Sequence, residues 1–141
     1  MTDGAISIML AGDLVLDEPD GAYWLSGIAP ALLAADLAIG HLEVPHKLRG
    51  YELKGDVPAP GAPPENLAAV AEAGFDALSL AGNHMADCGP EGIADTLSGL
   101  AVEGMLHSGA ALSLAAARRA AISSARSLRL RAASMASHST P

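Results

Sequence analysis

Short apolar runs that end in polar residues recur along the chain and predict a set of buried strands. The runs cover Ile6–Asp13, Asp36–Pro45, Phe75–Gly82 and Met105–Gly109. Continuous apolar character over so few residues is typical of strands that are covered on both faces. We therefore expect these four segments to be strands, the second of them ending in a polar turn at His41–Glu43.

Segments with helical spacing of apolar residues lie between these strands. They cover Ala29–Ala35, Pro64–Gly74 and Gly89–Gly104, and each carries its apolar residues on one face. The prolines and glycines between His46 and Pro64 predict an irregular loop, with at most a short extended piece at Tyr51–Leu53. The alternation of strand and helix predicts an α/β fold, with a mainly parallel sheet, flanking helices and right-handed connections.

The last part of the chain has a different character. Residues 111–141 are dominated by Ala, Ser, Arg and Leu and contain neither glycine nor an acidic residue. Leu112–Ile122 favours a helix, whereas the low complexity beyond Ser123 favours disorder. We therefore divide the chain into a domain of residues 1–110 and a tail of residues 111–141 that is partly helical or disordered.

Charge and composition limit the partners and the compartment. The 141 residues carry a formal charge of −8, which argues against nucleic acid or an anionic membrane surface as a partner. Cys88 is the one cysteine, so no disulfide forms within the chain. The first ten residues carry an acid where a secretory signal carries positive charge. The most apolar stretch, Trp24–Gly40, is interrupted by Pro30 and Asp36, so we expect a cytoplasmic protein without a membrane span.

Polar side chains stand at the ends of three predicted strands and form the main candidate site. They are Asp13, then His41 with Glu43, then Asn83 with His84. The carboxyl ends of parallel strands meet at one edge of a sheet, so these groups are expected to converge. Carboxylate and amide oxygens suit Mg²⁺ or Mn²⁺, and added imidazole suits Zn²⁺ or Fe. We expect a divalent metal that activates a phosphoryl group or water, with His84 protonating a leaving oxygen.

Each candidate also has a structural interpretation. Asp13 follows a glycine at a strand end and would then cap a turn or helix, and Glu43 in a turn would be solvated. Asn83 would be a turn residue that tolerates the left-handed backbone. Asp87 either orients His84 or caps the following helix. The sequence alone leaves these alternatives open.

The motifs around these residues resemble one known family. Residues 74–100, "GFDALSLAGNHMADCGPEGIADTLSGL", strongly resemble the CapA family of poly-γ-glutamate capsule synthesis proteins, which belongs to the calcineurin-like metallophosphoesterase superfamily. The resemblance extends over about Ile6–Gly109. The motifs that carry it are Gly12-Asp13, His41-Leu42-Glu43, Asn83-His84 and Asp87-Cys88-Gly89.

The resemblance implies a fold, a site and a role. The fold would be a metallophosphoesterase-like αββα sandwich, present here in truncated form. Asp13, Glu43 and Asn83 would be ligands of a divalent metal (Mn, Mg, Zn or Fe), and His84 the catalytic acid or phosphate-binding residue. The substrate would be a small molecule or a polymer precursor in capsule synthesis.

The chain also departs from the family pattern. His41 stands where the family usually has Asn, and we interpret it, like His46, as a loop residue rather than a ligand. The further His motifs of the family, including Gly-His-x-His, are absent, and the tail does not resemble the family beyond about Ile122. We therefore expect a truncated or frame-shifted product.

Two functions follow from this comparison. The first is a metal-dependent phosphoesterase of the capsule synthesis type, whose metal site is incomplete. The second is a non-catalytic fragment or interaction module, which self-associates through an uncovered sheet face. A generic nucleotide-binding domain is disfavoured, because no glycine-rich phosphate loop follows the first strand.

Overall fold

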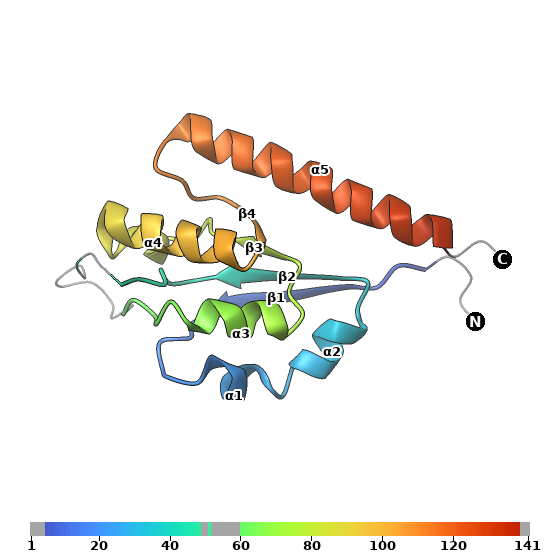
Figure 1. The fold of residues 1–141 in the computed structure, drawn as a ribbon, viewed down its shortest axis with the longest axis horizontal. Helices are drawn as coiled ribbons and strands as arrows, with labels where there is room; N and C mark the ends of the chain where they lie inside the picture. The colour runs from blue at the N-terminus through green and yellow to red at the C-terminus, as the bar shows by residue number, and fades with distance from the viewer. Residues whose placement is uncertain (1–4, 49–50, 52–59, 139–141) are drawn as a thin grey trace.

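A parallel sheet forms the centre of the molecule. The computed structural model describes residues 5–48, 51 and 60–138. In the described residues, the strands are ordered β1-β2-β3-β4 and every neighbouring pair is parallel (Figure 1). They comprise β1 (Ile8–Leu14), β2 (Leu37–Leu42), β3 (Ala77–Ser79) and β4 (Leu106–Ser108). The predicted α/β fold with a parallel sheet is thereby confirmed.

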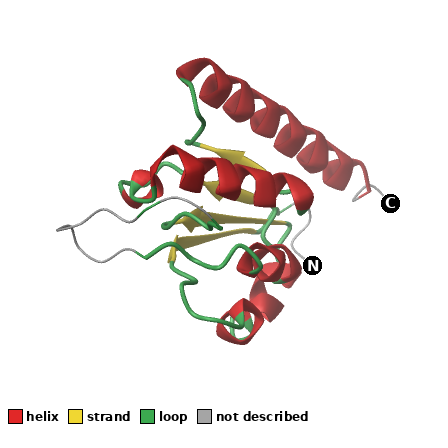
Figure 2. Ribbon diagram, turned by 60° about the vertical axis from the view of Figure 1, so that its left-hand side comes forward, coloured by secondary structure: helices red, strands yellow, loops and turns green. Residues whose placement is uncertain are grey.

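Helices connect these strands and cover the sheet (Figure 2). Strand order follows chain order, so right-handed connections place all of the connecting helices on one face. Residues from each of these connections enter one hydrophobic cluster, as this arrangement requires. The helices are α1 (Gly21–Leu25), α2 (Ala29–Ala34), α3 (Asn66–Glu72), the 3₁₀ helix η1 (His84–Ala86), α4 (Gly89–Val102) and α5 (Leu114–His138).

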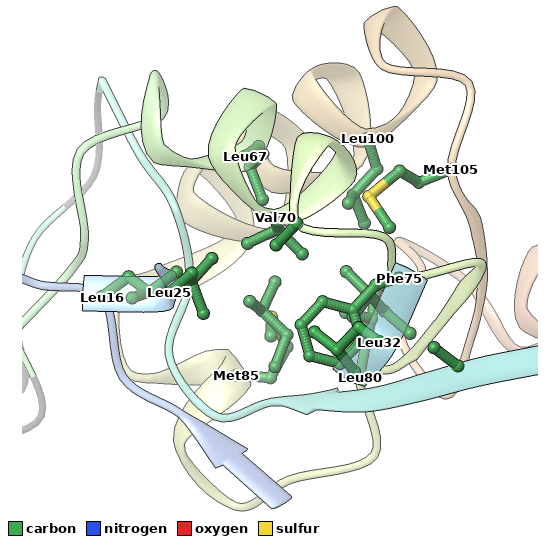
Figure 3. Close-up of a cluster of buried hydrophobic side chains, with 14 residues drawn as sticks. Leu16, Leu25, Leu32, Leu67, Val70, Phe75, Leu80, Met85, Leu100 and Met105 are labelled. Carbon is green, nitrogen blue, oxygen red and sulfur yellow. The ribbon is translucent and has the colours of Figure 1, made fainter. Parts of the chain in front are cut away.

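The core between the sheet and the connecting helices is built from aliphatic side chains around a single phenylalanine (Figure 3). Leu32, Val70 and Leu100 are almost completely buried there, and Phe75 lies among them. Gly40 of β2 allows the close approach of Phe75, because an added Cβ would lie 3.0 Å from its ring. The small side chains of the sequence thus permit close packing of helices on the sheet.

The opposite face of β1 is exposed. Met9 and Ala11 pack against the core, so the alternation of a strand directs Ile8 and Leu10 to the other face. These two side chains are 58% and 74% exposed. Helix α5 packs against β4, at the other edge of the sheet, where the Ser124 hydroxyl donates to the His107 carbonyl at 2.7 Å.

Several elements differ from the sequence prediction. Helix α1 was not predicted, because five residues show no helical periodicity. Strand β2 includes His41 and Leu42, which were predicted to begin a turn. Helix α5 continues to His138, past Ser123, because Ala, Leu and Arg favour helix and no glycine or proline interrupts them.

Two further expectations concern the loop and the membrane. The irregular loop from His46 to Pro64, including the extended piece at Tyr51–Leu53, falls in part outside the described residues. Within the described part of the chain, no helix combines the length and the apolar character that a membrane span requires.

Asn66 fixes the segment after β1 to the start of α3. Its side-chain oxygen accepts from the Gly21 amide at 3.0 Å, and its nitrogen donates to the carbonyls of Leu16 and Glu18, both at 2.9 Å. The side chain is buried, so these bonds satisfy backbone groups that water does not reach. This network holds α1 against α3 and defines the path of the chain beyond Asp13.

His46 is a second buried polar residue, and it lies in the segment that follows β2. Its backbone amide donates to the Thr96 hydroxyl at 2.9 Å, and that hydroxyl donates in turn to the Gly92 carbonyl at 2.8 Å. The imidazole is fully buried. Burial lowers the pKa of His46 from 6.5 to about 4, because the charged ring would lose its hydration.

The stability of the protein should therefore fall at acid pH through His46. The unfolded chain binds the proton below pH 6.5 and the folded protein only below about pH 4, so the stabilisation is complete above pH 6.5 and is lost as the pH falls to 4. The shift corresponds to about 3 kcal/mol of unfolding free energy. Urea titrations between pH 4 and 7 should show a much smaller pH dependence in His46→Asn than in the wild type.

His107→Asn is the matched control. Burial also lowers the pKa of His107, but its ring is only partly buried, so its removal should flatten the profile less. Equal pH dependence in the wild type and His46→Asn would contradict this account.

Candidate functional site

A backbone irregularity near the end of β1 positions Asp13. The pairing of β1 with β2 shifts register between Ala11 and Leu14, and Asp13 within this bulge has φ of 49°. A residue other than glycine adopts this left-handed region at an energetic cost, and such strain is concentrated at functional sites. The bulge places the Asp13 carboxylate beside β2, where Asp13 Oδ1 lies 3.0 Å from His41 Nδ1.

His41 and Glu43 complete a cluster with Asp13 at the carboxyl edge of the sheet. His41 Nδ1 lies 3.3 Å from Glu43 Oε2, so the same nitrogen faces both carboxylates. One ligand atom from each of the three residues lies within 4.8 Å of the other two. The Asp13 side chain is 79% exposed and the Glu43 side chain 16%, so the cluster is open on one side and enclosed on the other.

His84 approaches this cluster from η1, which follows β3. Its Nε2 lies 3.9 Å from Glu43 Oε1, and its Nδ1 lies 2.6 Å from Asp87 Oδ2. A carboxylate oxygen accepts hydrogen bonds, so we assign the ring proton to Nδ1, which donates the hydrogen bond to Asp87. Asp87 therefore fixes the ring, and Nε2 is the nitrogen presented to Glu43.

Asn83 directly precedes His84 at the end of the loop after β3, and it is exposed. Its φ of −70° lies in the right-handed region, and its side chain does not cap η1. The interpretation of Asn83 as a left-handed turn residue is therefore wrong. The structure does not bring its side chain into a described contact with Asp13 or Glu43.

The structure also bears on the structural alternatives for the two carboxylates. Asp20, rather than Asp13, caps α1, since its carboxylate accepts from the Tyr23 amide. The Glu43 side chain is largely buried and contacts two imidazoles, so it is not a solvated turn residue. Asp87 orients His84, and the N-cap residue of the following helix α4 is Cys88.

Gly82 has no side chain, and this leaves room for the cluster. A Cβ at this position would lie 2.8 Å from His41 Nε2 and 3.4 Å from Glu43 Oε2. Gly82 also borders a cavity of about 280 Å³ whose other walls, between the η1 loop and the start of α5, are mainly small and apolar. Any larger residue at position 82 would displace the His41 ring.

The donor set fits a divalent cation. It combines two carboxylate oxygens with an imidazole nitrogen, a mixture that transition metals and zinc accept. The ligand atoms already lie close enough to share one ion, and the glycine leaves their inner side free of a side chain. In the described part of the chain, Asp13, His41 and Glu43 thus form a group of side chains that could hold a metal ion.

Sequence reasoning did not find the position of His41. The family pattern and its neighbours suggested a loop residue, whereas the structure places it in β2 between the two carboxylates. The alternation of side chains along β2 is the signal that could have placed His41. Ala38 and Leu42 face the core, so His41 must face the opposite side, on which the bulged Asp13 presents its carboxylate.

Residues 7–141 match the family model described as bacterial capsule synthesis protein PGA_cap. This chain belongs to the PGA_cap family. The match confirms the resemblance to CapA proteins, and it extends to residue 141, past the whole of α5, so the expectation that the resemblance ends near Ile122 is wrong. A comparison with curated proteins gives no match.

The site of this PGA_cap protein should lose the fixed orientation of His84 when Asp87 is removed. Free neutral imidazole favours the proton on Nε2, so Asp87→Ala should move the His84 proton from Nδ1 toward Nε2. Long-range ¹H–¹⁵N NMR of the imidazole nitrogens measures this directly. Asp87→Asn keeps an acceptor oxygen and should retain the wild-type tautomer; an unchanged tautomer in Asp87→Ala would contradict the assignment.

Proposed function

We propose that this protein acts in capsule synthesis, on a precursor or product of poly-γ-glutamate, through a metallophosphoesterase-type site. Asp13, Glu43 and Asn83 would hold a divalent cation (Mn, Mg, Zn or Fe), and His84 would be the catalytic acid. The observation that carries the proposal is the convergence of Asp13, Glu43 and His84 at the carboxyl edge of the sheet. Asn83 supports it, because its exposed amide caps no helix and stands next to His84.

Each side chain has a distinct part in phosphoester hydrolysis. A bound cation would supply Lewis acidity that neutralises charge on the phosphoryl oxygens. Asp87 holds His84 so that Nε2 faces the site, and in its doubly protonated form His84 donates a proton from Nε2 to the leaving oxygen. The exposed Asp13 lies on the open side, where a substrate enters, and the enclosed Glu43 lies behind it.

The surroundings of the site favour a small substrate or the end of a polymer. The cavity beside Gly82 is lined mainly by small apolar side chains, so it suits an uncharged part of the substrate next to the reacting phosphate. The formal charge of −8 disfavours polyanions such as nucleic acids. We propose that the protein acts on this substrate in the cytoplasm.

The test is metal-dependent hydrolysis of p-nitrophenyl phosphate esters. The wild type with Mn²⁺ should turn over substrate, a chelator should stop it, and Asn83→Ala should lose it. His84→Ala should lower kcat by about 10²-fold or more, because it removes the proton donor. His107→Asn, outside the site, is the matched control and should keep wild-type activity.

Absence of both turnover and metal uptake in the wild type would contradict this function. Loss of activity in His107→Asn equal to that in His84→Ala would show that the effect is structural.

The alternative function is a non-catalytic module that self-associates. The observation that favours it is the exposed face of β1, an edge strand that carries Ile8 and Leu10 in solvent. A second copy of the chain, placing the same face against this one, would cover both side chains.

If the protein self-associates through β1, it should form a dimer that two lysines introduced on this strand disrupt. In sedimentation velocity at micromolar concentration, the wild type should sediment as a dimer and Ile8→Lys/Leu10→Lys as a monomer. Leu33→Lys/Val102→Lys changes two apolar residues elsewhere that are slightly more exposed, and it should remain dimeric. A monomeric wild type would exclude this interface.

A further inference from the structure

We propose that His41 Nδ1 is a direct protein ligand of the cation, in addition to Asp13, Glu43 and Asn83. This inference rests on the proposed function and deepens it. The proposed ligands are Asp13, Glu43 and Asn83, and the resemblance to CapA proteins implies an amide residue where this chain has His41. The substitution therefore changes the chemistry of the site and is not a neutral difference.

The spacing of the donor atoms carries the first part of the argument. His41 Nδ1 lies 3.0 Å from Asp13 Oδ1 and 3.3 Å from Glu43 Oε2, and it is the atom that faces both. Two ligands bound to one ion at about 2.1 Å lie about 3.0 Å apart at right angles and about 3.4 Å apart in tetrahedral geometry. The spacing around Nδ1 is therefore that of neighbouring ligands in one coordination shell.

The orientation of the ring carries the second part. His41 Nε2 is enclosed by protein and has no hydrogen-bond partner within the described part of the chain. Gly82 stands on that side, and a Cβ there would lie 2.8 Å from Nε2. Because Nε2 is enclosed and Nδ1 faces both carboxylates, Nδ1 is the nitrogen available to the open side of the cluster.

The chemical consequence is a change in metal preference. Mg²⁺ prefers oxygen ligands, whereas imidazole nitrogen favours Zn²⁺, Fe²⁺ and the later transition metals. An amide residue at position 41 would offer oxygen, and His41 offers nitrogen. We expect this chain to select Zn²⁺ over Mg²⁺ more strongly than its own His41→Asn variant does.

The experiment is metal binding by isothermal titration calorimetry with Zn²⁺ and Mg²⁺ separately. His41→Ala should weaken Zn²⁺ binding by more than about 100-fold, since even residues that only orient ligands contribute 10–100-fold. Mg²⁺ binding should change by less than about threefold, because the carboxylates remain. His41→Asn should show the same loss of selectivity, and His107→Asn should match the wild type.

A second measurement needs no variant that might unfold. In long-range ¹H–¹⁵N NMR of the wild type, Zn²⁺ should shift His41 Nδ1 and leave Nε2 protonated. If the wild type binds metal while His41 Nδ1 does not shift, this inference fails and the proposed function stands. If the wild type binds neither metal, the proposed function fails with it.

Discussion

The parallel pairing of β1 and β2, with its one bulge, determines where the candidate chemistry lies. Parallel strands end at the same edge, so Asp13 and Glu43 reach that edge from separate strands. The shift of register between Ala11 and Leu14 then places the Asp13 carboxylate against His41. A regular β1 would carry Asp13 in an extended conformation, and the cluster would not form in this way.

The core and the candidate site depend on the same packing. Gly40 lets Phe75 and Leu14 approach β2 closely, and this fixes the strand that carries His41. Asn66 holds the chain beyond β1 against α3 through backbone hydrogen bonds. The Asp13 backbone is left-handed at an energetic cost, which the packing on both sides of the bulge offsets.

Most of the fold could be predicted from the sequence, because the spacing of apolar residues and the positions of glycine and proline are local signals. The helix that ends at Gly74 and the apolar run after Phe75 were readily identified. The length of α5 was not, since low complexity resembles disorder although Ala, Leu and Arg are good helix formers.

Candidate site residues were harder to assign than the fold. Asp13, Glu43 and His84 follow from their places at strand ends. The contact between His41 and Asp13 depends on strand register and on a bulge that no spacing in the sequence reveals. The choice between cap and orienting partner for Asp87 likewise required coordinates, because both roles suit an aspartate before a helix.

The most direct test is the position of a bound ion. Crystals of the protein grown with Mn²⁺ should give one anomalous scattering peak at the sheet edge, about 2.1 Å from oxygens of both Asp13 and Glu43. A peak elsewhere, or carboxylates of residues 13 and 43 that diverge in the measured density, would contradict the account.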